Sequence, residues 1–354
     1  MKHLINSFVA AVFTFGIGTT SVSAGNELDS NNNANASNVP MGSEGSTNTS
    51  YGRGALSKNT RGNWNTAIGS AALQKNTGSR NTASGYQALY KNTTGWYNTA
   101  SGSYALYHNY GNFNTASGDS ALYQNTRGYQ NTASGSYALT GNTKGSYNIA
   151  IGVSALHFNT TGNYNTALGV SSGYKNKTGS SNVFIGYKAG YSEKGNSKLY
   201  IDNSDTKKPL VYGDFLKNTL KVNGRMYATK FIKSSDARLK TDIRPLNNSL
   251  DTVLKLQGKQ YRLIDEAVNQ TDIGLIAQDV EKVLPQIVSQ TEDGYKAIDY
   301  QSLTTVLIEA MKEQQGQIMI LEKENTELKA LVSGQMEKLL ARVAMLEGST
   351  LAEN

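Results

Sequence analysis

Several residue types that proteins use for chemistry are scarce in this chain of 354 residues. It has no cysteine, which excludes disulfide bonds and thiol catalysis. Histidine occurs only at His3, His108 and His157, too few for a histidine metal site or a Ser-His-Asp triad. Between residues 48 and 181 the only acidic residue is Asp119, whereas glycoside hydrolysis usually needs two carboxylates. We therefore expect no metal or other cofactor, and a polysaccharide hydrolase is disfavoured.

Concentrated positive charge and long apolar runs are also missing. The net charge of +7 is spread along the chain, without the basic cluster that phosphate binding requires, so no nucleic-acid partner is expected. The apolar run of residues 8–17 is about half the ~20 residues that a membrane span needs. Preceded by Lys2 and followed by small residues, it predicts a signal peptide over 1–24, cleaved after Ala24. The mature chain is thus expected to be secreted or at the cell surface, without a membrane span.

A regular repeat follows a polar, low-complexity leader at 25–47, which we expect to be flexible. The repeat units occupy residues 48–190 and have a period of 17, occasionally 16, residues. They start at Asn48, Asn65, Asn81, Asn98, Asn114, Asn131, Asn148, Asn165 and Asn182. Each unit has short N-T-A-x-G and A-L-x-x-N-T segments separated by glycine, too short for helices. The period predicts a β-solenoid in which Asn and Thr form ladders of stacked side chains.

The sequence predicts little buried apolar surface inside such a solenoid. One Ala and one Leu per coil bury too little to offset the roughly 1–2 kcal/mol per residue of backbone ordering, which favours several chains packed around an axis. The segments NTAIG at 65–69 and NIAIG at 148–152 resemble the head repeats of trimeric autotransporter adhesins. This resemblance implies a trimeric β-roll. The longer period and the frequent NTASG segments depart from those heads.

Aromatic residues recur at two positions of the repeat. One set follows the Leu and the other precedes the next Asn: Tyr90, Tyr107 and Tyr123, and Trp64, Tyr97, Phe113, Tyr147 and Tyr164. Such columns either stack between rungs and cover the edges of the coils, or bind sugar rings. The ligand of the fibre, whether a host surface, a matrix component or a glycan, is not identified by the sequence.

The C-terminal part has a different composition. Alternating apolar and polar residues predict a β neck at 191–234. Residues 235–300 mix helical and strand patterns, with Ser249 as a candidate helix cap, a buried strand at DIGLIA (272–277) and a hairpin turn at Asp293-Gly294, which predicts a small α+β domain. Apolar residues in heptad spacing predict an oligomeric coiled coil over 301–348, with one stutter, and the trimer implied by the resemblance of the repeats makes it a trimeric coiled coil. Its core positions are Leu307, Met311, Gln314, Ile318, Leu321, Asn325, Leu328, Val332, Met336, Leu339, Val343 and Leu346.

Three segments of this C-terminal part occur in a specific order. They are SSDARLKTDI at 234–243, GLIAQDVEKVLPQIV at 274–288 and AIDYQSLTTVLIEAMKEQQGQI at 297–318. Together they resemble the intramolecular chaperone domain of endosialidases and phage tail spikes, the self-cleaving peptidase S74 family. The resemblance implies a single-turnover serine endopeptidase that cuts between Ser234 and Ser235, with Ser235 as nucleophile and Lys240 as general base.

Physical chemistry sets a condition on such a Ser/Lys pair. A serine hydroxyl is a weak nucleophile without a base, and a lysine amine, with an ordinary pKa of about 10.4, is protonated at neutral pH. Desolvation has to lower such a pKa by about three, at a cost of about 4 kcal/mol, so cleavage is expected only after neighbouring chains bury the pair. Asp236, Arg238 and Asp242 are motif residues, either orienting groups or ordinary salt bridges and caps. The alternative is a structural fibre whose C-terminal domain trimerises without cleavage.

Overall fold

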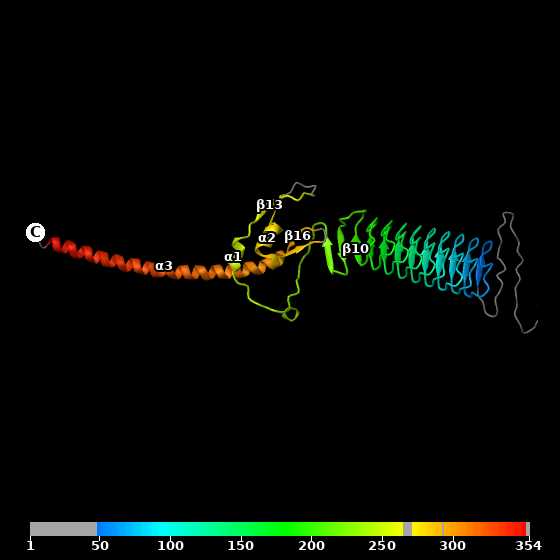
Figure 1. Cartoon of the computed structure of the whole chain (residues 1–354), viewed down its shortest axis with the longest axis horizontal. Coiled ribbons are helices and arrows are strands. Elements are labelled where there is room, and N and C mark those ends of the chain that lie inside the picture. Colours follow the sequence, from blue (N-terminus) through cyan, green and yellow to red (C-terminus); the bar gives the residue numbers. More distant parts are fainter. Residues whose placement is uncertain (1–47, 265–270, 292–293, 352–354) are drawn as a thin grey trace, which may run out of the picture. The chain divides into compact units, whose positions relative to one another are not determined.

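The computed structural model describes residues 48–264, 271–291 and 294–351. The expected signal peptide (1–24) and leader (25–47) lie outside the described residues, as does Asp293 of the expected hairpin turn. The chain forms two compact units, one on each side of the bond that follows Lys230 (Figure 1). Of the helices that the structure describes, none is long and apolar enough to cross a bilayer.

Nine short strands form the rungs of the first unit in the described part of the chain (Figure 1, blue to green). Each strand pairs in parallel with the next, and equivalent repeat positions face each other, as with Ala83 and Ala100. The predicted β-solenoid is therefore confirmed. Its strands are β1 (Thr49–Tyr51), β2 (Thr66–Ile68), β3 (Thr82–Ser84), β4 (Thr99–Ser101), β5 (Thr115–Ser117), β6 (Thr132–Ser134), β7 (Ile149–Ile151), β8 (Thr166–Leu168) and β9 (Val183–Ile185).

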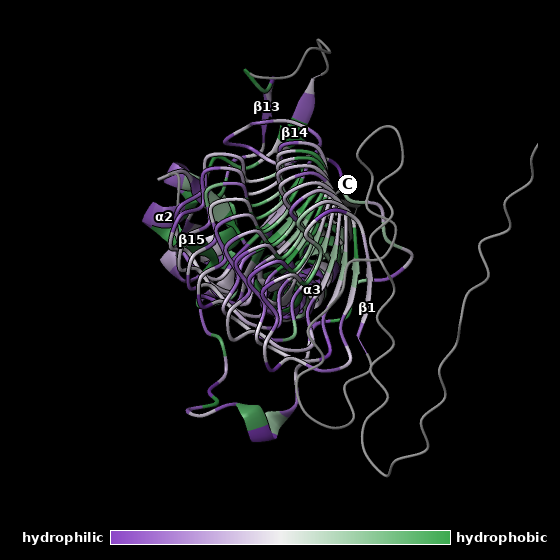
Figure 2. Cartoon of the chain, turned by 90° about the vertical axis from the view of Figure 1, so that its right-hand side faces the viewer, coloured by the Kyte–Doolittle hydropathy of each residue, from purple (hydrophilic) through white to green (hydrophobic). Residues whose placement is uncertain are grey.

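The apolar interior of a typical coil contains two alanines and one leucine. In the coil of β4 these are Ala100, Ala105 and Leu106, each at most 1% exposed, whereas Thr99 and Ser101 on either side of Ala100 face outward. Figure 2 views the stacked coils end-on and shows the apolar residues repeating from coil to coil. The strand alternation thus places one small residue inside and two polar residues outside on the rungs with the sequence Thr-Ala-Ser, β3 to β6.

Two asparagines per coil are also buried and form ladders that run along the solenoid. They are Asn59, Asn76, Asn92, Asn109, Asn125, Asn142, Asn159 and Asn176 in one ladder and Asn65, Asn81, Asn98, Asn114, Asn131, Asn148, Asn165 and Asn182 in the other. The Asn114 amide donates to the Gly128 carbonyl (2.9 Å). Its Oδ1 accepts from the backbone N–H and the side-chain amide of Asn131, at 3.0 and 3.1 Å.

The interior is therefore larger than the one Ala and one Leu per coil expected from the sequence, and that expectation is wrong. The difference arises from a second alanine in each typical coil and from the asparagines, most of whose side-chain groups find hydrogen-bond partners inside the coil, with Oδ1 of Asn159 and of Asn176 as exceptions. These interior residues are already shielded from solvent in a single chain. Close contact between rungs adds a steric requirement: a Cβ at Gly102, where φ is 134°, would lie 2.4 Å from the Gly118 carbonyl oxygen.

Aromatic side chains form columns on the outside of the solenoid. The rings of Tyr90, Tyr107 and Tyr123 stack nearly parallel, with centroids 5.2 and 5.1 Å apart. Tyr147 and Tyr164 stack in the same way at 4.9 Å. These contacts are the cross-rung ladders expected from the repeat. Because stacked rings cover one another's faces, the faces between neighbouring rings are not open to a sugar.

Three further strands follow the rungs. The strand β10 (Lys198–Ile201) continues the parallel stack on β9, and β11 (Val211–Asp214) and β12 (Thr219–Val222) then pair antiparallel. The short strands predicted for this region are thus present. Lys198 Nζ lies 2.6 Å from Asp214 Oδ2, and the Asp214 side chain is buried. The hydrogen bond from Lys198 lowers the pKa of the Asp214 carboxyl below its ordinary value.

The second unit contains short helices and two small hairpins, followed by one long helix. The elements are η1 (Ala237–Leu239), α1 (Ser249–Leu254), β13 (Lys259–Tyr261), β14 (Asp272–Gly274), α2 (Ala277–Val283), η2 (Pro285–Ile287), β15 (Val288–Gln290), β16 (Lys296–Ile298) and α3 (Tyr300–Leu351). The predicted mixture of helices and strands in a small domain is confirmed. Two details are wrong: Asn248, not Ser249, holds the cap position of α1, and Ile273 in the strand expected to be buried is 77% exposed.

The long helix α3 includes the whole segment predicted as a coiled coil. Its apolar heptad positions are largely exposed in the single chain: Leu307, Met311, Ile318, Leu321, Leu328, Val332, Met336, Leu339 and Val343 range from 40% to 69% exposed. A helix with a continuous exposed apolar seam is unfavourable in water, and pairing with other helices buries the seam. The helix is thus confirmed, whereas its partner helices stay a prediction.

Candidate functional site

Ser235 and Lys240 lie on opposite sides of one tight turn. The Asp236 side chain accepts a hydrogen bond from the Arg238 backbone N–H (2.9 Å) and so caps η1. The backbone N–H groups of Leu239 and Lys240 donate to the carbonyls of Asp236 (3.1 Å) and Ala237 (3.0 Å). The turn reverses the chain locally and brings the fifth residue after Ser235 back beside it.

The two candidate catalytic side chains are in direct contact. Lys240 Nζ lies 2.7 Å from Ser235 Oγ and 3.1 Å from the Ser235 carbonyl oxygen. This is the separation required for a base that takes a proton from a hydroxyl nucleophile. Both side chains are exposed in the single chain. The geometry is thus that of a nucleophile and its base, while their catalytic roles stay a prediction.

The supporting motif residues divide into a pair and a single residue. Arg238 donates to both carboxylate oxygens of Asp236, with Nη2 at 2.6 Å and Nε at 3.1 and 3.2 Å. This interaction lowers the pKa of the Asp236 carboxyl and raises that of the guanidinium. Asp242 has a left-handed backbone (φ 54°) and is exposed. The pair stabilises the turn next to the dyad, in agreement with the salt-bridge and cap interpretation.

One ion pair near the dyad was not singled out from the sequence. Lys233, which precedes Ser234, places Nζ 3.0 Å from Asp299 Oδ2 and 3.3 Å from Ser302 Oγ. Asp299 also accepts from the Ser302 hydroxyl (2.6 Å) and from the backbone N–H groups of Gln301 and Ser302 (both 3.1 Å). The Ser302 hydroxyl and then the Lys233 amine hold the pKa of the Asp299 carboxyl far below its usual range. The sequence feature that could have pointed to Asp299 is an Asp just before a long helical pattern, where residues that cap helices are common.

An acidic residue within α3 holds the start of α1. The Glu313 carboxylate accepts from the backbone N–H groups of Ser249 (2.9 Å) and Leu250 (2.8 Å). These two hydrogen bonds lower the pKa of the Glu313 carboxyl. The carboxylate thus replaces the side-chain cap that Asn248 does not provide. Such a cap from a residue more than 60 positions away could not be read from local sequence.

The segment that carries the dyad exposes large apolar side chains. Phe231, Ile232, Leu239, Ile243 and Leu246 are between 47% and 79% exposed. Residues 231–248 are all exposed in the single chain. Exposed apolar clusters of this kind mark surfaces that bind another protein or another copy of the chain.

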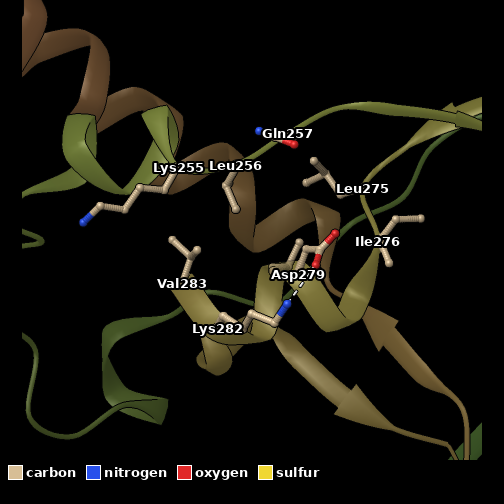
Figure 3. A pocket seen from close by; sticks show the side chains of 9 residues that line it. Lys255, Leu256, Gln257, Leu275, Ile276, Asp279, Lys282 and Val283 are labelled. Atoms are coloured by element: carbon tan, nitrogen blue, oxygen red, sulfur yellow. Dashed lines mark hydrogen bonds and ion pairs between the residues drawn. The ribbon is translucent and has the colours of Figure 1, made fainter.

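A pocket of about 240 Å³ lies between the end of α1 and α2 (Figure 3). Leu256, Leu275 and Val283 give it an apolar lining, and Lys282 forms an ion pair with Asp279 (3.1 Å) at its edge. Ser235 and Lys240 do not line this pocket. Among the described residues, no group of three or more His, Asp or Glu side chains is arranged to hold a metal ion.

The chain has recognisable relatives among fibre proteins. The long tail fibre protein Gp37 of Enterobacteria phage T2 is 35% identical over 127 residues, which cover 31% of this chain and 9% of the phage protein. The Gp37 protein of Salmonella phage S16 is 34% identical over 119 residues, covering 31% and 16%. That of Enterobacteria phage M1 is 36% identical over 92 residues, covering 24% and 37%. The chain thus spans much less than half the length of each of these relatives.

A family model covers the dyad itself. Residues 235–289 match the Peptidase S74 model, described as the chaperone of endosialidase. The match begins at Ser235, includes Lys240 and continues to the first residues of the β15–β16 hairpin. The resemblance inferred from the three C-terminal segments is therefore confirmed, and residues 235–289 form a chaperone-of-endosialidase region of the Peptidase S74 family.

Proposed function

We propose that this protein is a secreted, trimeric fibre whose C-terminal unit directs assembly and then cleaves itself off between Ser234 and Ser235. The observation that carries the proposal is the 2.7 Å contact between Lys240 Nζ and Ser235 Oγ, at the first residue of the chaperone region. The solenoid would be the mature fibre. The fibre names of the relatives support this class of function.

The chemistry follows from the position of Ser235 at the bond to be cut. With Lys240 accepting its proton, Ser235 Oγ attacks the carbonyl carbon of Ser234, and the C–N bond to Ser235 breaks as the nitrogen takes up a proton. The result is an ester between the Ser234 carbonyl and Oγ. Water then hydrolyses the ester, which releases a carboxylate at Ser234 and restores the hydroxyl of Ser235. Each chain turns over once.

Assembly would supply the missing condition for this reaction. An exposed lysine amine, with its ordinary pKa of about 10.4, is unprotonated in only about one molecule in 2500 at pH 7. Lys240 is exposed in the single chain, and so are the apolar side chains of residues 231–248 around it. Packing of three chains over this segment would remove water from the amine and favour its neutral form. Cleavage would thus follow assembly and not precede it.

The exposed seam of α3 supports a trimer as the assembling unit. A coiled coil of local heptads forms quickly and sets the register between chains, whereas β structure that depends on non-local pairing forms slowly. The C-terminal unit would therefore bring three chains together early, while the rungs of each solenoid pair within one chain.

A non-cleaving fibre is the alternative, and a substitution series separates the two. The self-cleaving fibre predicts a C-terminal fragment from the wild type that Ser235→Ala and Lys240→Ala both lose. Ser234→Ala is the matched control, because Ser234 contributes only its backbone carbonyl and should still cleave. Full-length chain in every variant, including the wild type, would establish the alternative.

A further inference from the structure

We propose that Asp299 and Glu313 are positioning residues that fasten both ends of the dyad-bearing segment to α3, so that the coiled-coil helix sets the geometry of the scissile peptide. The segment, residues 233–249, is called the cleavage strap below. This inference rests on the self-cleavage proposed above. It assigns a part in the reaction to Glu313 of α3 and to Asp299, the residue just before α3.

Two contacts fasten the cleavage strap and are called clamps below. The first clamp, between Lys233 and Asp299, lies immediately before the scissile bond. Lys233 is the residue that precedes Ser234, and its amine contacts the Asp299 carboxylate (3.0 Å) and the Ser302 hydroxyl (3.3 Å). The same carboxylate accepts the N–H groups of Gln301 and Ser302 at the start of α3. A single carboxylate thus joins the chain entering the scissile bond to the first turn of the helix.

The second clamp closes the other end of the cleavage strap. Glu313 accepts the backbone N–H groups of Ser249 and Leu250, where α1 begins. Asp299 and Glu313 are 14 positions apart (313 − 299), which corresponds to about 21 Å along a helix with a rise of 1.5 Å per residue. The strap is therefore held at two separated points of one rigid element.

Between the clamps the cleavage strap has mainly local support. Its hydrogen bonds are those within η1, the Asp236–Arg238 pair, the contact from Lys240 to Ser235 and, next to the second clamp, the two that the Asn248 carbonyl accepts from Thr252. Residues 234–248 are exposed in the single chain. Local contacts fix the dyad within its turn, whereas the clamps fix the chain around the scissile carbonyl. A misplacement of 1 Å can slow such an attack by about 100-fold, because nucleophile and carbonyl must start about 3–3.5 Å apart.

The first clamp allows a substitution that separates positioning from folding. Asparagine caps helices as well as aspartate does, so Asp299→Asn keeps the start of α3 while removing the negative charge that holds Lys233. Exposed ion pairs contribute little to overall stability. Lys233 and Asp299 are 60% and 42% exposed, so loss of this pair should leave the unit folded and trimeric.

The test is a time course of cleavage in the full-length chain, with the oligomeric state measured by light scattering. We expect Lys233→Gln and Asp299→Asn each to slow cleavage at least about tenfold, the double variant to be no slower than the slower single variant, and Lys233→Arg to retain the wild-type rate. Glu313→Gln should also slow cleavage. The matched control is Asp279→Asn, which breaks an exposed ion pair of α2 with Lys282 outside the strap and both clamps and should cleave at the wild-type rate.

Three results would overturn the inference while the wild type still cleaves. These are wild-type rates in the clamp variants, a double variant slowed by the product of the single effects, or loss of the trimer in Asp299→Asn, which would make the residue merely structural. A wild type that never cleaves would instead refute the proposed self-cleavage and this inference with it. The Ser235→Ala variant defines the uncleaved reference in each case.

Discussion

Replacing Leu321 and Leu328 by lysine should prevent assembly of α3 and slow self-cleavage by about a thousandfold. These leucines are 60% and 57% exposed in the single chain, so the substitutions should not disturb the fold of the monomer. Burying a leucine contributes about 1.5–3 kcal/mol, so completing the burial of six leucines in a trimer contributes roughly 5–10 kcal/mol. Six lysines at these positions would remove that contribution and add repulsion between like charges.

The effect on cleavage follows from the protonation of lysine. A lysine amine with a pKa lowered to about 7 by burial is unprotonated in half of the molecules at pH 7, compared with about one in 2500 at its ordinary pKa. Without assembly, the rate of proton removal from the serine hydroxyl should fall by this ratio, which is about 10³.

The assay is light scattering for the oligomeric state and a cleavage time course by gel. The control variant carries Lys323→Ala and Glu327→Ala, which remove an exposed ion pair of α3 outside the predicted core positions and should leave assembly and cleavage unchanged. Cleavage at the wild-type rate in a monomeric Leu321→Lys, Leu328→Lys chain would refute the view that assembly activates the dyad.

Three further predictions concern single side chains. Asn114→Ala removes the ladder hydrogen bonds with Gly128 and Asn131 and leaves the buried Asn131 backbone N–H without its side-chain acceptor, whereas the Gly128 carbonyl still accepts from Asn125 and the Asn131 amide still donates to Gly145. It should therefore destabilise the solenoid by about 1–3 kcal/mol in urea unfolding, whereas exposed Thr115→Ala should cost less than about 0.5 kcal/mol. Lys240→Arg keeps the positive charge but cannot act as a base, so the purified chain should stay full length by mass spectrometry. Because Lys198 lowers the pKa of Asp214, the pair should stabilise the neck above about pH 4 and lose this effect as the pH falls. The difference in Tm between wild type and Asp214→Asn should therefore narrow on acidification, and a difference that is constant from pH 7 to pH 3 would contradict this.

The repeat made the solenoid predictable, because period, strand length and turn residues agree in every unit. The buried asparagines show the limit of that prediction. Asn98 is polar, which by itself predicts an outward position, yet its side chain is fully buried, and its amide donates to Asn81 Oδ1 of the preceding unit and to the Gly111 carbonyl. These hydrogen-bond partners become apparent only when the coils are stacked, so the interior estimated from Ala and Leu alone was too small.

The spacing of Ser235 and Lys240 could also be predicted from the sequence, because residues 234–243 resemble a known motif. A five-residue separation becomes a contact of 2.7 Å because η1 forms between Ser235 and Lys240. The clamps at Asp299 and Glu313 depend on pairs more than 60 positions apart in the chain. No local pattern encodes such pairs, since they arise from the packing of the strap and α1 on α3.

Self-cleavage is tested most directly by N-terminal sequencing and intact mass measurement of the C-terminal fragment from the purified wild-type protein. We predict a fragment that begins Ser235-Asp236-Ala237, and its absence from Ser235→Ala and Lys240→Ala. A wild type that stays uncut across Ser234–Ser235, or a Ser235→Ala chain that is still cut at this bond, would contradict the assignment of Ser235 and Lys240.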